Sequence, residues 1–168
     1  LQSAIFDIDE MARAIEAWKT KQAGIEARFI DLAGYINGQM PHFVVDKVQH
    51  ALNDHSKPLK GSHVHVMGVA YKRDIDDVRE SPALDIIHLL GKRGAKVTYS
   101  DPYVPKLHTD GLNMESTDAL AATSAADCVM IVTDHRTIDY GPIVANAKLI
   151  VDTRNALKAF PSDKIVRL

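Results

Sequence analysis

The spacing of apolar residues changes near residue 58. Before that point apolar residues recur at helical spacing, which predicts one helix over about 1–27 and a second over about 28–55. An apolar stripe runs along the second helix over 29–52, and Pro41 is expected to kink that helix or divide it in two. A stripe of this length needs a cover, either from the rest of the chain or from a partner subunit.

After residue 60, short apolar runs alternate with helical segments of about ten residues. The expected strands are 63–67, 96–100, 112–114, 128–133, 149–152 and 164–168, and the expected helices are 82–92, 116–124 and 138–147. This alternation predicts an α/β fold, a Rossmann-like parallel sheet with helices on both faces, preceded by a long helical segment. The right-handed crossover rule favours the strand order 3-2-1-4-5-6. The chain is therefore predicted to divide into a helical segment, 1–57, and a Rossmann-like domain, 58–168.

Cationic and aromatic residues follow three of the expected strands. Tyr71 and Lys72 come after the first strand, the stretch 133–135 after the fourth, and Arg154 after the fifth. In such sheets ligands lie beyond the carboxyl ends of the strands, so these side chains should meet at one crevice. Ser81 begins the helix that follows the first loop, and a helix N-terminus favours anions. The sequence therefore predicts a phosphate site, and a nucleotide diphosphate fits it best.

Other residues near this crevice have a simpler interpretation. Arg79 lies among acidic residues and could pair with them at the surface instead of contacting a ligand. The turn 68–72 lacks the pattern G-x-G-x-x-G, which argues against NAD in its standard pose at this turn. Asp101 ends the second strand, where Rossmann proteins often place a ribose-binding acid. Without the glycine pattern, Asp101 and Pro102 are interpreted as a strand-ending turn.

The histidines and the cysteine in the strands are interpreted as structural. His63 and His65 share a face of the first strand, but no further ligand lies at a suitable spacing for zinc. Cys128 lies in the most apolar strand, where a free cysteine is usually a core residue rather than a nucleophile.

Composition excludes several classes of partner. The 168 residues include 20 basic and 22 acidic side chains, a net charge of −2, without a basic block that would predict nucleic-acid binding. No apolar run reaches membrane-spanning length, so no membrane partner is expected. One cysteine allows no internal disulfide, which is compatible with a cytoplasmic protein.

The stretch GVAYKRDIDDVRESPALDIIHLLGKRGAKVTYSDPYVP, residues 68–105, resembles the UDP-glucose/GDP-mannose (nucleotide-sugar) 6-dehydrogenase family. Further similar stretches are 27–48, 126–135 and 151–157, and the resemblance extends from about Trp18 to the end. It is strongest to the branch that oxidises UDP-N-acetylhexosamines.

The resemblance implies a domain arrangement and a set of roles. Family members combine an NAD-binding domain, a helical central domain and a C-terminal UDP-binding domain. They oxidise the sugar C6 hydroxyl to a carboxylate in two NAD-dependent steps through a cysteine thioester. The resemblance places Tyr71, Lys72 and Arg154 on the UDP-sugar, and Arg79 on NAD held by the absent N-terminal domain. It also implies a homodimer formed through the central helices, here the stripe 29–52.

The start of the chain departs from the family pattern. Relatives carry the catalytic cysteine about ten residues before the position of Trp18, whereas 5–11 here contains none, and 1–17 is not family-like. We therefore expect the chain to bind UDP or a UDP-sugar but to be inactive alone. The alternative is a dimerising scaffold domain with a vestigial nucleotide site. An independent NAD-dependent oxidoreductase is disfavoured by the missing glycine pattern.

Overall fold

A computed structural model of the chain describes residues 28–109 and 111–168. The expected helix over 1–27 and the departure at 5–11 lie outside the described residues. The chain forms two compact units, Leu1–Pro41 and His42–Leu168. Helix α2 (Arg28–Asp54) begins in the first unit and ends in the second.

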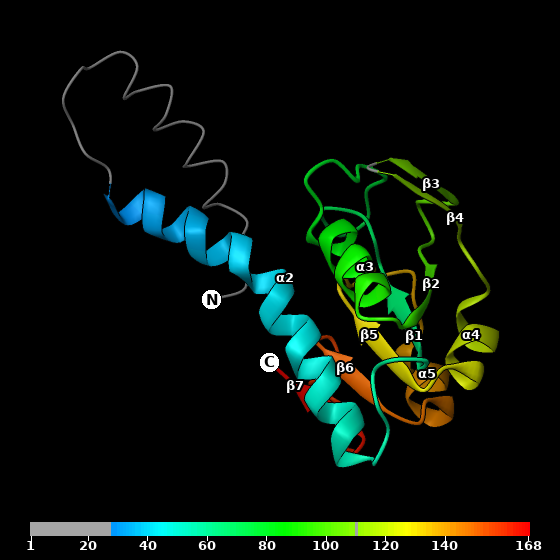
Figure 1. The fold of residues 1–168 in the computed structure, drawn as a ribbon. Coiled ribbons are helices and arrows are strands. Elements are labelled where there is room, and N and C mark those ends of the chain that lie inside the picture. The colour runs from blue at the N-terminus through cyan, green and yellow to red at the C-terminus, as the bar shows by residue number, and fades with distance from the viewer. Residues whose placement is uncertain (1–27, 110) are drawn as a thin grey trace, which may run out of the picture. The chain divides into compact units, whose positions relative to one another are not determined.

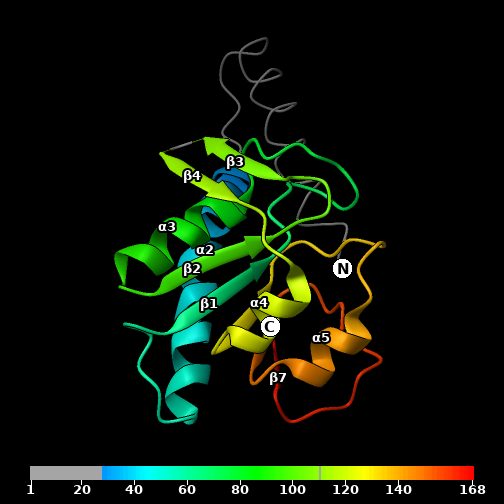
Figure 2. The ribbon, with the colours of Figure 1, turned by 90° about the vertical axis from the view of Figure 1, so that its right-hand side faces the viewer.

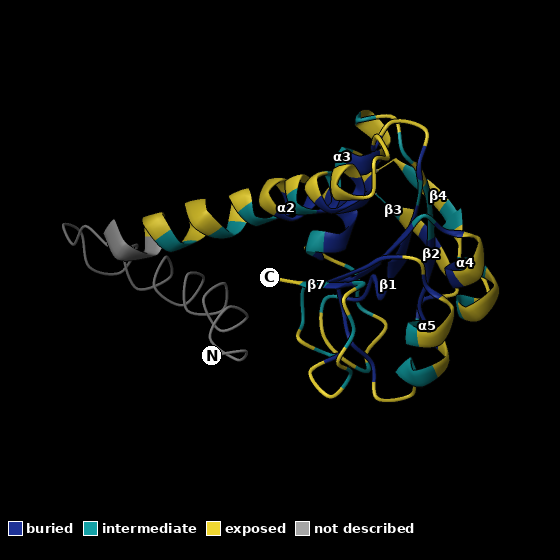
Figure 3. Ribbon diagram, turned by 90° about the horizontal axis from the view of Figure 1, so that it is seen from below, coloured by how far each residue is buried: buried dark blue, intermediate teal, exposed yellow. Residues whose placement is uncertain are grey.

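Helix α2 includes Pro41 within a single helix, so of the two outcomes expected at this proline, a kink or a division, the division does not occur. Helix formation is cooperative, and the hydrogen bonds on either side of the proline are enough to continue it. In the second unit the last turns of α2 bury Val44, Val45, Val48, Ala51 and Leu52. Much of α2 is exposed (Figure 3). Its exposed large apolar residues are Leu32, Tyr35, Ile36 and Phe43. No helix in the described part of the chain is long and apolar enough to cross a membrane.

The second unit is built on a five-stranded parallel sheet with the order β2-β1-β5-β6-β7. Its strands are β1 (His63–Met67), β2 (Lys96–Ser100), β5 (Cys128–Ile131), β6 (Ile150–Asp152) and β7 (Ile165–Arg167). Every residue of β5 and β6 is buried, as expected for strands covered on both faces. The chain turns from β1 to β2 on one side and from β5 to β6 on the other, so the topological switch point lies between β1 and β5.

Helices cover both faces of the sheet (Figure 1). Helix α3 (Pro82–Lys92) and the last turns of α2 lie on one face, and α4 (Ala119–Ala125) and α5 (Tyr140–Asn146) lie on the other (Figure 2). Arg93 connects the first pair, because its Nη1 contacts Asp46 Oδ1 and donates to Gln49 Oε1 at 3.1 Å. The Rossmann-like prediction is confirmed, including the start of α3, where the Ser81 hydroxyl accepts from the Ala83 N–H.

Two local predictions are wrong. The stretch expected as a third parallel strand is β4 (Leu112–Glu115), which pairs antiparallel with β3 (Lys106–Thr109) in a separate hairpin. The sequence between them is Asp110-Gly111, a pair typical of two-residue hairpin turns, and Gly111 has a φ of +76°. The helix expected over 116–124 begins later, because its cap is Asp118, whose carboxylate accepts from the Ala121 N–H.

Candidate functional site

The register of the sheet brings four loops to one edge. Met67 of β1 pairs with Ser100 of β2 and with Ile131 of β5, and Ile131 pairs with Asp152 of β6. Four strands therefore end at the same level. The loops that follow them, which contain Tyr71, Lys72, Asp134 and Arg154, leave the sheet side by side.

Gly68 allows a close approach between the loops after β1 and β5. Its φ is +78°, and a Cβ added there would lie 2.0 Å from the Thr133 carbonyl oxygen. Only glycine fits a position that is both left-handed and pressed against another backbone. The Thr133 hydroxyl donates to the Ala70 carbonyl oxygen at 2.6 Å, which ties the two loops together.

Asp101 organises the backbone at the end of β1. Its Oδ2 accepts from the N–H groups of Val69 (2.7 Å) and Ala70 (3.1 Å), and its Oδ1 accepts from those of Tyr103 and Val104. The turn expected at Asp101 is therefore present, but the carboxylate also reaches 32 residues back along the chain. Burial alone raises the pKa of Asp101, but the hydrogen bonds from His135, Tyr103 and Val69 outweigh it and keep the pKa below its ordinary value.

His135 extends this network to the other side of the loop. Its Nδ1 accepts from the Asp74 N–H at 2.9 Å, which leaves the proton on Nε2 to be donated to Asp101 Oδ2 at 3.1 Å. The Tyr103 ring packs at 5.1 Å from the His135 ring. Asp74 in turn accepts from the Arg136 N–H and pairs with the Arg136 side chain at 3.2 Å. The loop after β1 is thus held at its start by Asp101 and further along by His135.

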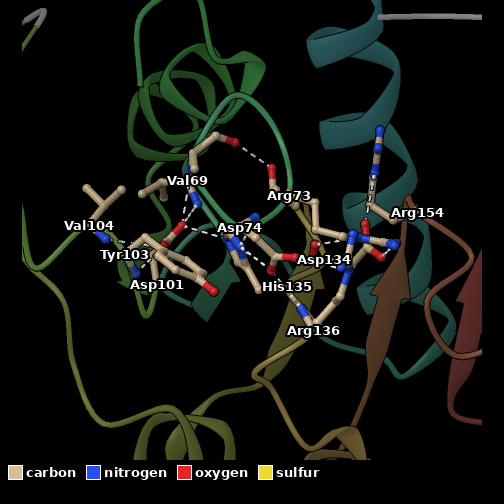
Figure 4. Close-up of polar contacts among 12 residues, drawn as sticks. Val69, Arg73, Asp74, Asp101, Tyr103, Val104, Asp134, His135, Arg136 and Arg154 are labelled. Carbon is tan, nitrogen blue, oxygen red and sulfur yellow. Dashed lines mark hydrogen bonds and ion pairs between the residues drawn. The ribbon is translucent and has the colours of Figure 1, made fainter. Parts of the chain in front are cut away.

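Two arginines from distant segments meet on one carboxylate, as the close-up in Figure 4 shows. The Arg73 Nη2 pairs with Asp134 Oδ2, and the Arg73 Nε donates to the Asp134 carbonyl oxygen at 3.2 Å. From the other side the Arg154 Nε lies 3.7 Å from Asp134 Oδ1. Burial is the main cause that lowers the pKa of Arg154, and the positive charge of Arg73 is the second. The second cause reflects how closely the two guanidinium groups approach.

The histidines of β1 and the cysteine of β5 make their contacts within the sheet. His65 is fully buried, with Nδ1 2.9 Å from the Thr98 hydroxyl and Nε2 2.9 Å from the Ser100 hydroxyl. His63 contacts the same Thr98 hydroxyl, and the described residues contain no group of side chains suited to a metal ion. Cys128 is buried, and burial raises the pKa of its thiol to about 12, so it is a core residue.

Comparison with known proteins identifies the family to which this domain belongs. The family model described as "UDP-glucose/GDP-mannose dehydrogenase family, UDP binding domain" matches residues 65–159, which include the loops after β1, β2, β5 and β6. The chain belongs to the UDP-glucose/GDP-mannose dehydrogenase family. Within this family, the matched region is the UDP-binding domain.

Individual dehydrogenases of the family are similar to this chain in sequence and in structure. The chain is 30% identical over 151 residues to an NDP-N-acetyl-D-galactosaminuronic acid dehydrogenase of Ralstonia nicotianae, covering 87% of this chain and 34% of that protein. It is 28% identical over 154 residues to a UDP-N-acetyl-D-mannosamine dehydrogenase of Methanococcus maripaludis, covering 86% and 34%. The solved UDP-D-ManNAc dehydrogenase of Pyrococcus horikoshii superposes with a TM-score of 0.72 at 28% identity, covering 88% and 34%. The chain thus spans about a third of the length of the relatives it matches.

The residues singled out through the family resemblance lie at this edge of the sheet in different settings. Tyr71 and Lys72 stand directly before Arg73, and the Lys72 Nζ is 5.4 Å from the centre of the Tyr71 ring. Arg79 pairs with Asp77 through Nε at 3.0 Å and Nη2 at 2.7 Å, while its side chain is 86% exposed. Hydrogen bonds from Arg79 lower the pKa of Asp77 to about 2. The surface pairing raised as an alternative for Arg79 is therefore present in the structure.

Sequence reasoning missed Arg73. The pair Lys72-Arg73 offers two cations, and the family resemblance directed attention to the lysine alone. In the structure Arg73 makes the contact that joins the loop after β1 to Asp134. Asp134 and His135 were expected at the crevice, but their partners across the loops could not be read from sequence spacing.

Proposed function

We propose that the chain binds UDP or a UDP-sugar at the carboxyl ends of β1, β5 and β6. One observation carries this proposal: Arg73 and Arg154, from segments about eighty residues apart in sequence, approach the same carboxylate beside the switch point. Two guanidinium groups that converge on one anion are typical of phosphate-binding sites. Lys72, next to Arg73 in the sequence, adds a third cation. In this proposal Tyr71, Lys72 and Arg154 contact the nucleotide-sugar substrate.

The turn after β1 does not fit NAD. In the standard dinucleotide pose, backbone N–H groups at this turn approach the pyrophosphate. Here the N–H groups of Val69 and Ala70 already donate to the buried Asp101 carboxylate, and Tyr71 follows where a small residue is needed. We therefore place NAD on another part of the whole dehydrogenase, with Arg79 reaching it from this domain.

The reaction of the whole protein belongs to the same proposal. It would be the NAD-dependent oxidation of the C6 hydroxyl of a UDP-sugar to a uronate, in the cytoplasm. This chemistry uses a nucleophilic cysteine, and Cys128 does not fit that role, because it is buried and its thiol pKa is about 12. The described part of the chain is therefore proposed to bind the nucleotide and not to oxidise the sugar by itself.

Pairing of two copies through α2 is part of the proposal as well. Leu32, Tyr35 and Ile36 recur at helical spacing and are each at least half exposed, and Phe43 continues the apolar series. Large apolar side chains in such a series are typical of a helix that packs against a partner. A homodimer formed through this surface would cover them.

Isothermal titration of the chain with UDP tests nucleotide binding. We expect heat of binding with UDP and about tenfold weaker binding for Lys72→Ala and for Arg154→Ala, since each removes one charge facing the diphosphate. Lys96→Ala removes an exposed charge at the start of β2, on the opposite edge of the sheet, and should leave the affinity unchanged. Uridine, which lacks phosphates, should bind much more weakly than UDP.

The alternative is a dimerising scaffold with a vestigial nucleotide site. The exposed apolar series on α2 is the observation that favours it. A dimer in light scattering, together with an absence of UDP binding, would support the scaffold and refute the proposed nucleotide site. Equal UDP affinity for the wild type and both alanine variants would also refute the assigned residues.

A further inference from the structure

Asp134 has an unusual place in the candidate site. Its side chain is 11% exposed and lies between Arg73 and Arg154, whose side chains are 48% and 21% exposed. A carboxylate between two guanidinium groups makes the same charge-assisted contacts that a phosphate oxygen would make. The chain therefore supplies an anion of its own at the point where a ligand's phosphate is proposed to bind.

The two arginines keep other attachments when this carboxylate is left out. The Arg73 Nε donates to the backbone carbonyl oxygen of Asp134, a contact that does not depend on the carboxylate. The Arg154 backbone N–H donates to Asp152 Oδ1 at 3.0 Å, which fixes the start of its loop. The contact between the Arg154 Nε and Asp134 Oδ1, at 3.7 Å, is longer than a hydrogen bond. The carboxylate thus acts on Arg154 mainly through its charge, and on Arg73 through a direct ion pair in addition to the backbone contact.

We propose that Asp134 is an internal counter-anion that competes with the nucleotide diphosphate for Arg73 and Arg154. The inference rests on the proposed nucleotide site and assigns to Asp134 the control of its affinity. An arriving diphosphate takes over the guanidinium groups, and the Asp134 carboxylate then repels it. The internal anion weakens binding, and it keeps two partly buried cations paired when no nucleotide is present.

The variant Asp134→Asn isolates the charge. It keeps the size and one side-chain oxygen, and the backbone contact to Arg73 is untouched. A unit charge facing a phosphate at about 5 Å in a partly solvated site corresponds to roughly a tenfold change in affinity. We expect Asp134→Asn to bind UDP about ten times more tightly than the wild type and to bind uridine equally well.

Two controls accompany the titration. Asp163→Asn makes the same charge change at an exposed residue just before β7, at the opposite edge of the sheet, and should leave UDP affinity unchanged. Asp134→Ser removes the charge with a smaller side chain and should also tighten UDP binding. It serves as the second variant if Asp134→Asn fails to fold, which circular dichroism shows.

The outcomes separate this inference from the proposed function. If the wild type binds UDP and both Asp134 variants bind it equally or more weakly, the nucleotide site stands and the competing role of Asp134 is refuted. A weaker variant would mean that the carboxylate positions the arginines. If neither the wild type nor the variants bind UDP, both proposals are refuted. Tighter UDP binding by the variants, with unchanged uridine binding, supports the internal anion.

Discussion

Replacing Asp101 by asparagine should destabilise the fold sharply. The carboxylate accepts five hydrogen bonds: Val69, Ala70 and His135 donate to Oδ2, and Tyr103 and Val104 donate to Oδ1. Asparagine keeps a single oxygen. Whichever way the amide turns, its NH2 group faces at least two N–H donors that have lost their acceptor.

The expected size of the effect follows from burial. Asp101 is 5% exposed, so water cannot replace the missing acceptor. A buried donor without an acceptor costs about 1–3 kcal/mol, and two of them give a loss of about 2–6 kcal/mol in the free energy of unfolding. Urea unfolding followed by circular dichroism at pH 7 measures this loss.

Asp118→Asn is the matched control. Asp118 also accepts from a backbone N–H, that of Ala121 at 2.7 Å, but it does so as the exposed cap of α4. Asparagine caps helices as well as aspartate does, so this variant should lose almost no stability. If Asp101→Asn loses less than about 1 kcal/mol, or no more than the control, the organising role argued for this carboxylate is wrong.

Two further predictions concern β1 and the glycine that follows it. Burial, together with the charge of His63, lowers the pKa of His65 from 6.5 to about 4, so between these values the unfolded chain binds a proton that the folded chain does not. The free energy of unfolding should therefore fall by roughly 3 kcal/mol as the pH drops from 6.5 to 4. The variant His65→Asn should flatten this part of the stability–pH curve, whereas His108→Asn, at an exposed histidine, should not. An unchanged slope in His65→Asn would contradict the reasoning. Gly68→Ala combines a left-handed backbone with a clash against Thr133 and should lose about 3 kcal/mol or more in urea unfolding. Gly61→Ala, at a φ of +86° with open space around it, should lose only about 1–2 kcal/mol, and equal losses would mean that the close approach at Gly68 is unimportant.

Local signals predicted the elements of this fold well. Ser81-Pro82 and Gly94 set the limits of α3, whose bounds agree with the expected 82–92, and Gly94 adopts a φ of +85°. The buried strands β5 and β6 were recognisable because strands covered on both faces are continuously apolar. The missed hairpin also has a local signal, the Asp110-Gly111 pair, which the parallel pattern around it obscured.

The partners of the site residues could not be predicted in the same way. Asp101 meets Val69 across 32 positions, and Arg73 meets Asp134 across 61. Those pairs depend on the strand register, which aligns the ends of β1, β2 and β5 to within a residue. Sequence spacing identifies which loops meet at an edge, but the choice between Lys72 and Arg73 as the residue that crosses to Asp134 depends on the loop's conformation.

Two internal carboxylates explain how a Rossmann-like topology can serve a purpose other than dinucleotide binding. Asp101 takes up the backbone N–H groups of the turn after β1, and its burial makes that arrangement permanent. The donors that hold a pyrophosphate in the standard pose are therefore already used, and attraction for an anion must come from side-chain cations. Those cations lie on the neighbouring loops and face Asp134, whose side chain is 11% exposed whereas that of Asp101 is fully buried. If Asp134 gives way to a diphosphate as proposed, the anion site lies among the side chains rather than at the backbone N–H groups, while the strand order stays that of a Rossmann-like sheet.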